Sequence, residues 1–329
     1  MQFNEAQQEA VDFYQGPCLT LAGPGSGKTA VITHRTKNLI EKYGVSPSEI
    51  LVVTFTKAAA MEMKERFLSL TNQTSTTATF GTFHAVFFTV LKYAYHYRAE
   101  NIIRDEQKVV FIRNLLRHFP IDYEDENECI QTLLSEISGV KNSNIPIEHY
   151  YSSNFPEHTF RDVFMNYQKM LQKNRLIDFD DMLVYTYELF SQRKDILALW
   201  QKKFRYILID EFQDINGLQY EIIRMLAAPE NNLFVVGDDD QSIYRFRQAR
   251  PEIMLNFEKD YADAKRIVLN YNYRSDGNIV AAAGRLIAHN TGRFAKDIKA
   301  FHPAKEAVVC KTYRTQREEN LGLIHEIGR

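Results

Sequence analysis

One glycine-rich segment, Ala22-Gly23-Pro24-Gly25-Ser26-Gly27-Lys28-Thr29, limits the possible folds of this chain more than any other part of the sequence. A short apolar run at residues 18–21 precedes it, and a helical pattern at residues 29–42 follows it. Glycine lets the backbone bend tightly enough for several N–H groups to point at one phosphate group, and the next helix adds partial positive charge at its N-terminus. The order strand, loop, helix therefore predicts a phosphate-binding loop in a parallel α/β sheet.

The residue types in this loop indicate a nucleoside triphosphate as the ligand. The segment matches the Walker A pattern, although Ala22 stands at the first position, where glycine is commoner. Lys28 is placed to reach the β- and γ-phosphates, and the Thr29 hydroxyl is a ligand for magnesium. All eight residues are predicted to bind the nucleotide. A chance glycine turn is the alternative, and the predicted strand and helix beside the loop argue against it.

A second predicted strand ends in two acidic residues. Residues 206–209 read Tyr-Ile-Leu-Ile, and Asp210 and Glu211 follow directly. Asp210 suits the shell of a phosphate-bound Mg²⁺, usually through water, and Glu211 suits the general base that deprotonates an attacking water. A solvated acidic turn is the alternative, and it is the weaker one beside a phosphate-binding loop. Together the two motifs predict magnesium-dependent hydrolysis of a nucleoside triphosphate.

Two stretches of the chain alternate apolar runs with helical patterns, which predicts parallel strands separated by helices. Further predicted strands lie at residues 50–55 and 233–236. Between the two stretches, residues 91–200 show apolar positions at helical spacing and almost no strand signal, which predicts a helical insertion.

A new unit is predicted to begin after residue 265. It contains a predicted strand at residues 267–269, a helix at residues 278–289 and another strand at Val308-Val309. The chain ends within a helical pattern at residues 318–329 that has no obvious cap, so we expect it to be a fragment of a longer protein.

Composition excludes several classes of protein. The 40 Lys and Arg residues against 42 Asp and Glu give a net charge of −2, so any contact with nucleic acid depends on local features. Cys18, Cys129 and Cys310 are far apart, which argues against a disulfide scaffold or a zinc site. The N-terminus does not resemble a signal peptide, and no run approaches the roughly 20 apolar residues of a membrane span. These features predict a soluble cytoplasmic protein without a membrane partner.

Several motifs in the same order along the chain resemble those of the UvrD/Rep/PcrA-type DNA helicases of superfamily 1A. The chain is similar to this family at its Q motif, motif Ia, a Thr-Phe-His element, an element before motif II, and motifs II, III and IV. These are residues 3–11, 54–63, 81–84, 178–183, 210–214, 236–247 and 272–275, respectively.

The resemblance implies roles around a bound ATP. Gln7 would contact the adenine edge, because an amide both donates and accepts hydrogen bonds, and Tyr273 would stack on the adenine face. Arg274 would act as an arginine finger, and Gln241 would contact the γ-phosphate. The implied catalytic set is therefore Lys28, Glu211, Gln241 and Arg274.

The resemblance also implies contacts with single-stranded DNA. Aromatic faces for stacking, together with cations for phosphates, hold a single strand without reading its sequence. From the residues alone, Phe55 and Phe246 are typical core aromatics, and His84 either touches DNA or caps a helix. The implied DNA-binding residues are Phe55, Thr56, His84, Tyr244, Phe246 and Arg247.

The chain departs from the family pattern at several positions. Ala30 stands where the family usually has Arg, and Lys57-Ala58 stands where motif Ia usually has Asn-Lys. Phe246 replaces a usual Trp, and Gln248 replaces a usual Gly. Motifs V and VI, which complete the second lobe, do not occur in this sequence.

The predicted fold class is α/β, a P-loop NTPase with a RecA-like parallel sheet lobe, an inserted all-helical subdomain and the start of a second RecA-like lobe. Residues 1–90 and 195–265 would form the first lobe, residues 91–194 the insertion, and residues 266–329 the start of the second lobe.

The resemblance implies an ATP-dependent DNA helicase that uses ATP and Mg²⁺ to move 3′ to 5′ on single-stranded DNA and to unwind duplexes. Its partners would be single-stranded DNA, junctions of single- and double-stranded DNA, and unidentified repair or replication proteins. One alternative is the motor subunit of a recombination helicase-nuclease. The other is a non-catalytic, ATP-dependent DNA-binding module.

Overall fold

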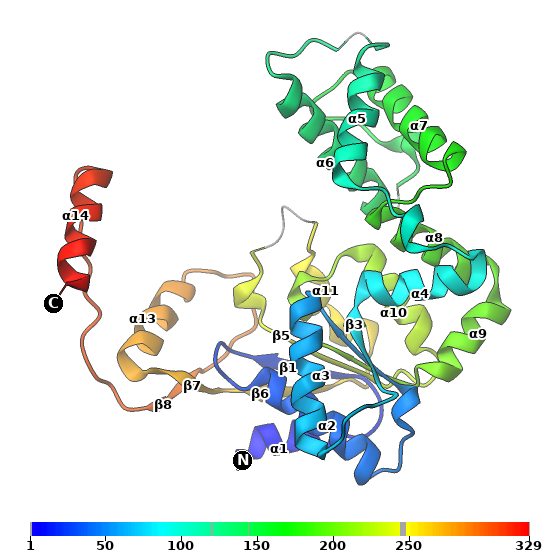
Figure 1. The fold of residues 1–329 in the computed structure, drawn as a ribbon. Coiled ribbons are helices and arrows are strands. Elements are labelled where there is room, and N and C mark those ends of the chain that lie inside the picture. Colours follow the sequence, from blue (N-terminus) through cyan, green and yellow to red (C-terminus); the bar gives the residue numbers. More distant parts are fainter. Residues whose placement is uncertain (1, 120, 144, 244–247, 329) are drawn as a thin grey trace.

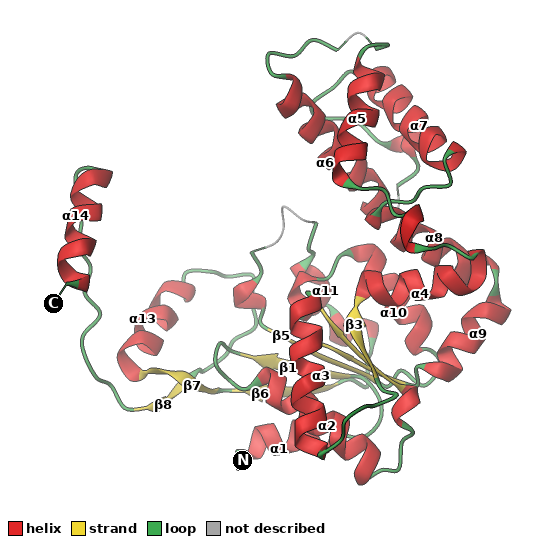
Figure 2. Cartoon of the chain, in the orientation of Figure 1, coloured by secondary structure: helices red, strands yellow, loops and turns green. Residues whose placement is uncertain are grey.

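A parallel β-sheet forms the centre of the computed structural model, which describes residues 2–119, 121–143, 145–243 and 248–328 (Figures 1 and 2). The sheet has six strands in the order β3-β2-β4-β5-β1-β6, and each neighbouring pair is parallel. The strands are β1 (Cys18–Ala22), β2 (Ile50–Thr54), β3 (Thr79–Thr82), β4 (Tyr206–Ile209), β5 (Leu233–Gly237) and β6 (Lys265–Leu269). All residues of β1, β2, β4 and β5 are buried, as expected for strands covered on both faces. The prediction of a parallel sheet is thus confirmed.

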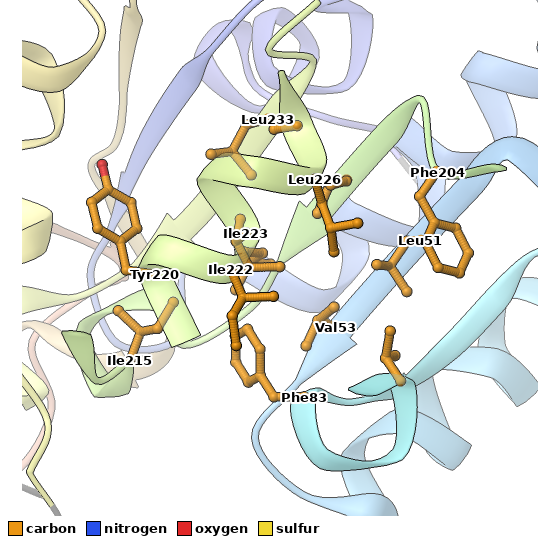
Figure 3. Packing of buried hydrophobic residues seen from close by; sticks show 14 of the residues in the cluster. Leu51, Val53, Phe83, Phe204, Ile215, Tyr220, Ile222, Ile223, Leu226 and Leu233 are labelled. Carbon is orange, nitrogen blue, oxygen red and sulfur yellow. The ribbon is translucent and has the colours of Figure 1, made fainter. Parts of the chain in front are cut away.

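Two layers of helices cover this sheet. Successive strand residues point to opposite faces, so alternate side chains join one of two apolar clusters. One face packs against α1 (Glu5–Asp12), α2 (Lys28–Glu41) and α3 (Lys57–Thr71). The other face packs against α4 (Phe83–Tyr95), α8 (Phe179–Gln192), α9 (Lys194–Lys203), α10 (Gly217–Ala227), α11 (Pro251–Leu255) and α12 (Phe257–Asp260). Figure 3 shows Ile222 and Leu226 of α10 beside Val53 and Leu51 of β2 in this second layer.

A group of helices that follows α4 and precedes α8 in the chain stands away from the sheet (Figure 1). It comprises α5 (Asp105–Leu116), α6 (Glu126–Ser143) and α7 (Glu157–Lys173), and we call it the helical bundle. The bundle has an apolar core of its own, which includes Ile112, Leu133 and Tyr167. Short 3₁₀ helices precede β2, α5 and α7 in the chain. They span Pro47–Glu49, Ala99–Asn101 and Ile147–His149, respectively.

Buried ion pairs connect the helical bundle to the first turn of α8. Lys141 Nζ on α6 lies 2.6 Å from Asp178 Oδ2 and 2.7 Å from Asp181 Oδ1, and these side chains are at most 5% exposed. Burial alone would lower the pKa of Lys141, but the two carboxylates outweigh burial and raise it. Next to this set, Asn142 Nδ2 donates to Asp180 Oδ1 at 2.6 Å. Polar side chains thus join two elements that are distant in the sequence.

The last part of the chain corrects two sequence-based predictions. The strand predicted to open the second unit is β6, and it pairs with β1 at the edge of the main sheet. Val308-Val309 was expected to form a strand but has no regular secondary structure. The second, two-stranded sheet instead pairs β7 (Tyr271–Asp276) with β8 (Lys299–His302). The helices of this region are α13 (Gly277–Ile287) and α14 (Gln316–Ile327).

Among the helices of the described residues, none combines the length and the apolar character needed to cross a membrane.

We predict that Lys141→Met lowers the free energy of unfolding by about 3–5 kcal/mol, because the substitution leaves two buried carboxylates without their cation. Urea denaturation followed by circular dichroism measures this change. The matched control is Lys169→Met on the exposed face of α7, which should change stability by no more than about 0.5 kcal/mol. Equal stability of the two variants would contradict the structural role of Lys141.

Candidate nucleotide site and nucleic-acid groove

The predicted phosphate-binding loop connects β1 to α2. Gly25 and Gly27 have φ angles of +67° and +83°, in the left-handed region that favours glycine. A Cβ atom on Gly25 would lie 2.7 Å from Arg274 Cβ, so a side chain at this position would also clash. Lys28 and Thr29 are the first two residues of α2, where the backbone N–H groups have no partner within the helix. The local structure of residues 22–29 therefore follows the sequence prediction.

Lys28 and Glu211 form an ion pair between the phosphate-binding loop and the end of β4. Lys28 Nζ donates to Glu211 Oε2 at 2.7 Å. Burial would raise the pKa of Glu211, but the Lys28 ammonium outweighs it and holds that pKa below its usual range. Glu211 is therefore ionised at neutral pH, as a general base must be.

Asp210 occupies a more buried position than Glu211. Its backbone N–H donates to the Val53 carbonyl at 2.9 Å, and its Oδ1 accepts a hydrogen bond from the Glu211 backbone N–H at 3.0 Å. Burial and the adjacent Glu211 charge raise the pKa of Asp210 to about 6. Within the described ranges, no cluster of three or more His, Cys, Asp or Glu side chains could hold a metal ion alone. One carboxylate plus Thr29 fits Mg²⁺ bound mainly by phosphates and water.

The residues predicted to contact adenine lie beside the same loop. Gln7 Nε2 donates to the Ser26 carbonyl at 2.9 Å, and its Oε1 accepts from the Asn4 backbone N–H at 3.1 Å. Tyr273 contacts the loop through its backbone N–H, which donates to the Gly25 carbonyl at 2.9 Å. Asn4 Nδ2 donates to the Tyr273 hydroxyl at 2.8 Å, so Asn4 links these two parts of the site. Asn4 belongs to the predicted Q motif at residues 3–11, but no role was predicted for it, although its position as the N-cap of α1 was a usable signal.

Arg274 adjoins the loop through its main chain and Cβ. Its backbone N–H donates to Asn272 Oδ1 at 2.8 Å, and the Ser275 backbone N–H donates to the same oxygen at 2.8 Å. The buried Asn272 side chain thereby fixes the irregular part of β7 that carries Arg274. Asn272 belongs to the predicted motif IV, but no role was predicted for it from the sequence.

Gln241 is the last residue of the 3₁₀ helix Asp239–Gln241 after β5, and its Nε2 donates to Asp238 Oδ2 at 2.7 Å. A second amide, Gln213, lies between this segment and Glu211. Gln213 belongs to the 3₁₀ helix Phe212–Asp214, accepts from the Asp238 backbone N–H and donates to Glu211 Oε2, each at 3.0 Å. Gln213 belongs to the predicted motif II, but no role was predicted for it from the sequence.

A cavity of about 460 Å³ lies where the first turns of α4 and α8 approach α6 and α10. Phe55, His84 and Phe179 contribute to its wall, with the rings of His84 and Phe179 edge to face at 5.5 Å. Thr82, and not His84, caps α4, because Thr82 Oγ1 accepts from the Ala85 backbone N–H. Burial lowers the pKa of His84. Its ring therefore presents a neutral, partly apolar surface to this cavity at neutral pH.

The structure brings together only part of the predicted DNA-binding set. Thr56 is exposed at the N-cap of α3, directly after Phe55, while Tyr244, Phe246 and Arg247 lie outside the described residues. Phe179 is 48% exposed at the cavity. It belongs to the predicted element at residues 178–183, but no DNA contact was predicted for it. The available signal was an aromatic residue directly after Asp178, a typical helix-capping residue.

Gln248 also lines the cavity and has a φ angle of +64°. The left-handed conformation explains in physical terms why glycine suits this position in the family that the chain resembles.

Comparison with known proteins identifies the same family along most of the chain. A family model described as the UvrD/REP helicase N-terminal domain matches residues 3–262. Over 306 residues, the chain is 41% identical to the putative ATP-dependent DNA helicase YjcD of Bacillus subtilis, covering 90% of this chain and 40% of that protein.

Two further relatives are named ATP-dependent DNA helicase PcrA. The protein from Bacillus subtilis is 38% identical over 96% of this chain and 43% of its own length. The protein from Leuconostoc citreum is 36% identical over 96% of this chain and 43% of its own length. The chain thus spans about two-fifths of the length of these curated relatives.

We predict that Asp210→Asn stabilises the nucleotide-free chain at pH 8, by on the order of 1–3 kcal/mol, and that the gain shrinks as the pH is lowered to 5. Folding raises the pKa of Asp210 from its ordinary value of 3.8 to about 6. The ionised carboxylate therefore destabilises the folded chain above about pH 6, and this cost disappears as the pH falls and Asp210 takes up a proton.

Urea denaturation at pH 5 and pH 8 measures this effect. Asp263→Asn, in the exposed turn before β6, is the matched control and should change stability little at either pH. A gain for Asp210→Asn that is the same at both pH values would contradict the raised pKa.

Proposed function

The chain belongs to the UvrD/Rep helicase family, and from this membership we propose that it is the ATP-hydrolysing, DNA-binding portion of an ATP-dependent DNA helicase. The observation that carries the proposal is the Lys28–Glu211 ion pair at the end of a phosphate-binding loop. This pair puts a phosphate-binding cation and an ionised general base in direct contact. The names of the relatives, ATP-dependent DNA helicases, support ATP as the nucleotide and DNA as the polymer.

Residues 22–29 would bind the triphosphate through backbone N–H groups and the Lys28 ammonium. The ammonium would exchange its contact with Glu211 for phosphate oxygens, which would free the Glu211 carboxylate to accept a proton from the attacking water. Thr29 and Asp210 would hold Mg²⁺, which offsets charge on the phosphates when bound. Gln241 and Arg274 would stabilise the γ-phosphate, and the adenine would lie near Gln7 and Tyr273.

Single-stranded DNA would bind at the cavity next to Phe55, Thr56 and His84. The family resemblance also assigns DNA contacts to Tyr244, Phe246 and Arg247, which lie outside the described residues. Stacking on aromatic rings accommodates any base, which suits a motor that moves along DNA of any sequence. The main sheet would form a RecA-like lobe with the helical bundle as an inserted subdomain, and β7 to α14 would begin a second lobe. The protein would also move 3′ to 5′ on single-stranded DNA and unwind DNA at junctions of single- and double-stranded DNA. It would work with repair or replication proteins.

The two alternatives predict different results. The motor subunit of a helicase-nuclease would hydrolyse ATP through the same residues, and a nuclease assay distinguishes it. A non-catalytic binding module needs no ionised base beside the phosphate-binding lysine. The contacts of Glu211 with Lys28 and Gln213 therefore favour an enzyme.

We predict that Lys28→Ala and Glu211→Gln separate nucleotide binding from hydrolysis. Loss of the Lys28 cation weakens ATP binding itself, because the ammonium contacts the phosphates in the ground state. Loss of the Glu211 carboxylate leaves ATP affinity nearly unchanged but lowers kcat by about 10²-fold or more. Nucleotide titration and steady-state ATPase assays with single-stranded DNA measure the two effects.

Lys64→Ala, at an exposed position on α3, is the control for removal of a lysine and should retain both binding and turnover. Near-normal turnover in Glu211→Gln would refute the role of Glu211 as the base.

We further predict that Phe55→Ala weakens the binding of a single-stranded oligonucleotide by about 1–3 kcal/mol, the contribution of one stacked base. Hydrolysis in the absence of DNA should remain close to that of the parent, because Phe55 does not belong to the nucleotide site. Fluorescence anisotropy measures the affinity. Tyr93→Ala provides a matched control, since Tyr93 is an exposed aromatic on α4 outside the cavity. Equal DNA affinities for the two variants would place the single strand elsewhere.

A further inference from the structure

Three consecutive aspartates, at residues 238–240, directly precede Gln241 and surround one lysine from a distant part of the chain. Lys296 Nζ lies 2.6 Å from Asp238 Oδ1 and 2.9 Å from Asp240 Oδ2, and it also contacts Asp239 Oδ1. The side chains of Lys296 and Asp238 have no exposed surface, and that of Asp239 is 2% exposed. This contact thus lies in the interior and joins the loop after β5 to the segment after α13.

Arg293 adds a second cation to the same group. Its Nε and Nη2 donate to the two oxygens of Asp240 at 2.5 and 2.6 Å, a bidentate geometry that fixes the orientation of both side chains. The backbone N–H of Phe294 donates to Asp239 Oδ2 at 2.7 Å. We call Arg293, Lys296 and the three aspartates the carboxylate clamp.

The charges of the carboxylate clamp depend on one another. Burial would lower the pKa of Lys296, but the three aspartates outweigh burial and raise it, so the ammonium stays charged. Burial would likewise raise the pKa of Asp240, but hydrogen bonds from Arg293 and Lys296 lower it. Without the cations, three adjacent carboxylates would repel one another inside the protein. The conformation of this loop therefore requires both cations.

The carboxylate clamp is continuous with the proposed general base. Asp238 contacts Lys296 through Oδ1 and accepts from Gln241 Nε2 through Oδ2, so one carboxylate holds both side chains. The Asp238 backbone N–H donates to Gln213, whose amide donates in turn to Glu211 Oε2. Gly237 permits this approach, because a Cβ atom there would lie 2.8 Å from Gln213 Oε1.

We propose that Lys296 and Arg293 are positioning residues that hold Asp238, and through it Gln241 and Gln213, in register with Glu211. The proposal rests on the hydrolysis proposed above and deepens it. Arg274 lies in β7, in the same part of the chain as Arg293 and Lys296. The carboxylate clamp therefore makes the geometry around Glu211 depend on the position of the segment from β7 to β8 relative to the main sheet.

The test uses Lys296→Met, the conservative variant Lys296→Arg, and Lys299→Met as a control. Lys299 is 54% exposed in β8 and pairs with Asp297, so its loss leaves the carboxylate clamp intact. We expect Lys296→Met to lower kcat for ATP by about 10- to 100-fold, because small displacements of catalytic groups have effects of this size. Binding of a non-hydrolysable ATP analogue should change by less than about threefold, since the phosphate-binding loop is untouched. Lys296→Arg should restore much of kcat, because it restores the charge.

A double-mutant cycle with Gln241→Ala separates positioning from a general loss of structure. If Lys296 acts through Gln241, Lys296→Met lowers kcat much less in the Gln241→Ala background than in the parent. Fully additive effects, or parental kcat in Lys296→Met, would overturn the proposal.

Two additional measurements keep the test decisive. If Lys296→Met does not fold, Arg293→Gln replaces it in the same assays and the same cycle, because Arg293 is 17% exposed and its loss removes the bidentate contact that orients Asp240 in the same loop. The side-chain amide NMR signals of Gln213 and Gln241 report on the geometry without turnover and should shift in the clamp variant but not in Lys299→Met. Unshifted amide signals refute the carboxylate clamp whatever the turnover of the parent. If these signals shift in the variant but the unsubstituted protein hydrolyses no ATP, the proposed function is refuted and the carboxylate clamp is not.

Discussion

All strands of the main sheet run in one direction, so the segments that follow β1, β4 and β5 leave the sheet at the same edge. The order β4-β5-β1 puts these three segments side by side. Because these strands are buried on both faces, a shift in register would move their side chains to the wrong layer, and the alignment is therefore fixed. This constraint brings Lys28 within 2.7 Å of Glu211, a residue 183 positions away in the sequence. The remaining contacts of the nucleotide site are arranged around that pair.

Buried carboxylates in the nucleotide site lower the stability of the folded chain. Burial and the charge of Glu211 raise the pKa values of Asp210 and Asp214 to about 6, so three neighbouring acids carry more negative charge than Lys28 neutralises. Phosphate chemistry with a divalent cation needs such acids, whereas the isolated chain would be more stable without the buried charges of Asp210 and Asp214. The two apolar clusters on the faces of the sheet offset this cost.

Buried cations also determine how the two other parts of the chain attach to the sheet and its helices. Lys141 lies between carboxylates of α8 and ties the helical bundle to the wall of the proposed DNA cavity. Lys296 lies between aspartates after β5 and ties the segment after α13 to the proposed hydrolysis site. In both places a polar set fixes one geometry, because a displaced charge would lose its partner inside the protein. A buried lysine between carboxylates therefore fixes the geometry at the cavity, and another does so at the nucleotide site.

The sequence by itself determined the features that depend on neighbours along the chain. The glycines, Lys28 and the acidic end of β4 follow from local backbone conformation and strand periodicity. Gln7 and Tyr273, to which the family resemblance gives adenine contacts, lie beside the phosphate-binding loop, and their roles stay predictions. Only the tertiary structure decided which sheet β6 joins, because a short apolar strand has no pattern that names its partner. The same holds for the roles of Asn4, Lys141, Phe179, Gln213 and Lys296. Each of these residues acts through groups that are distant in the sequence, and such contacts form only when the chain has folded.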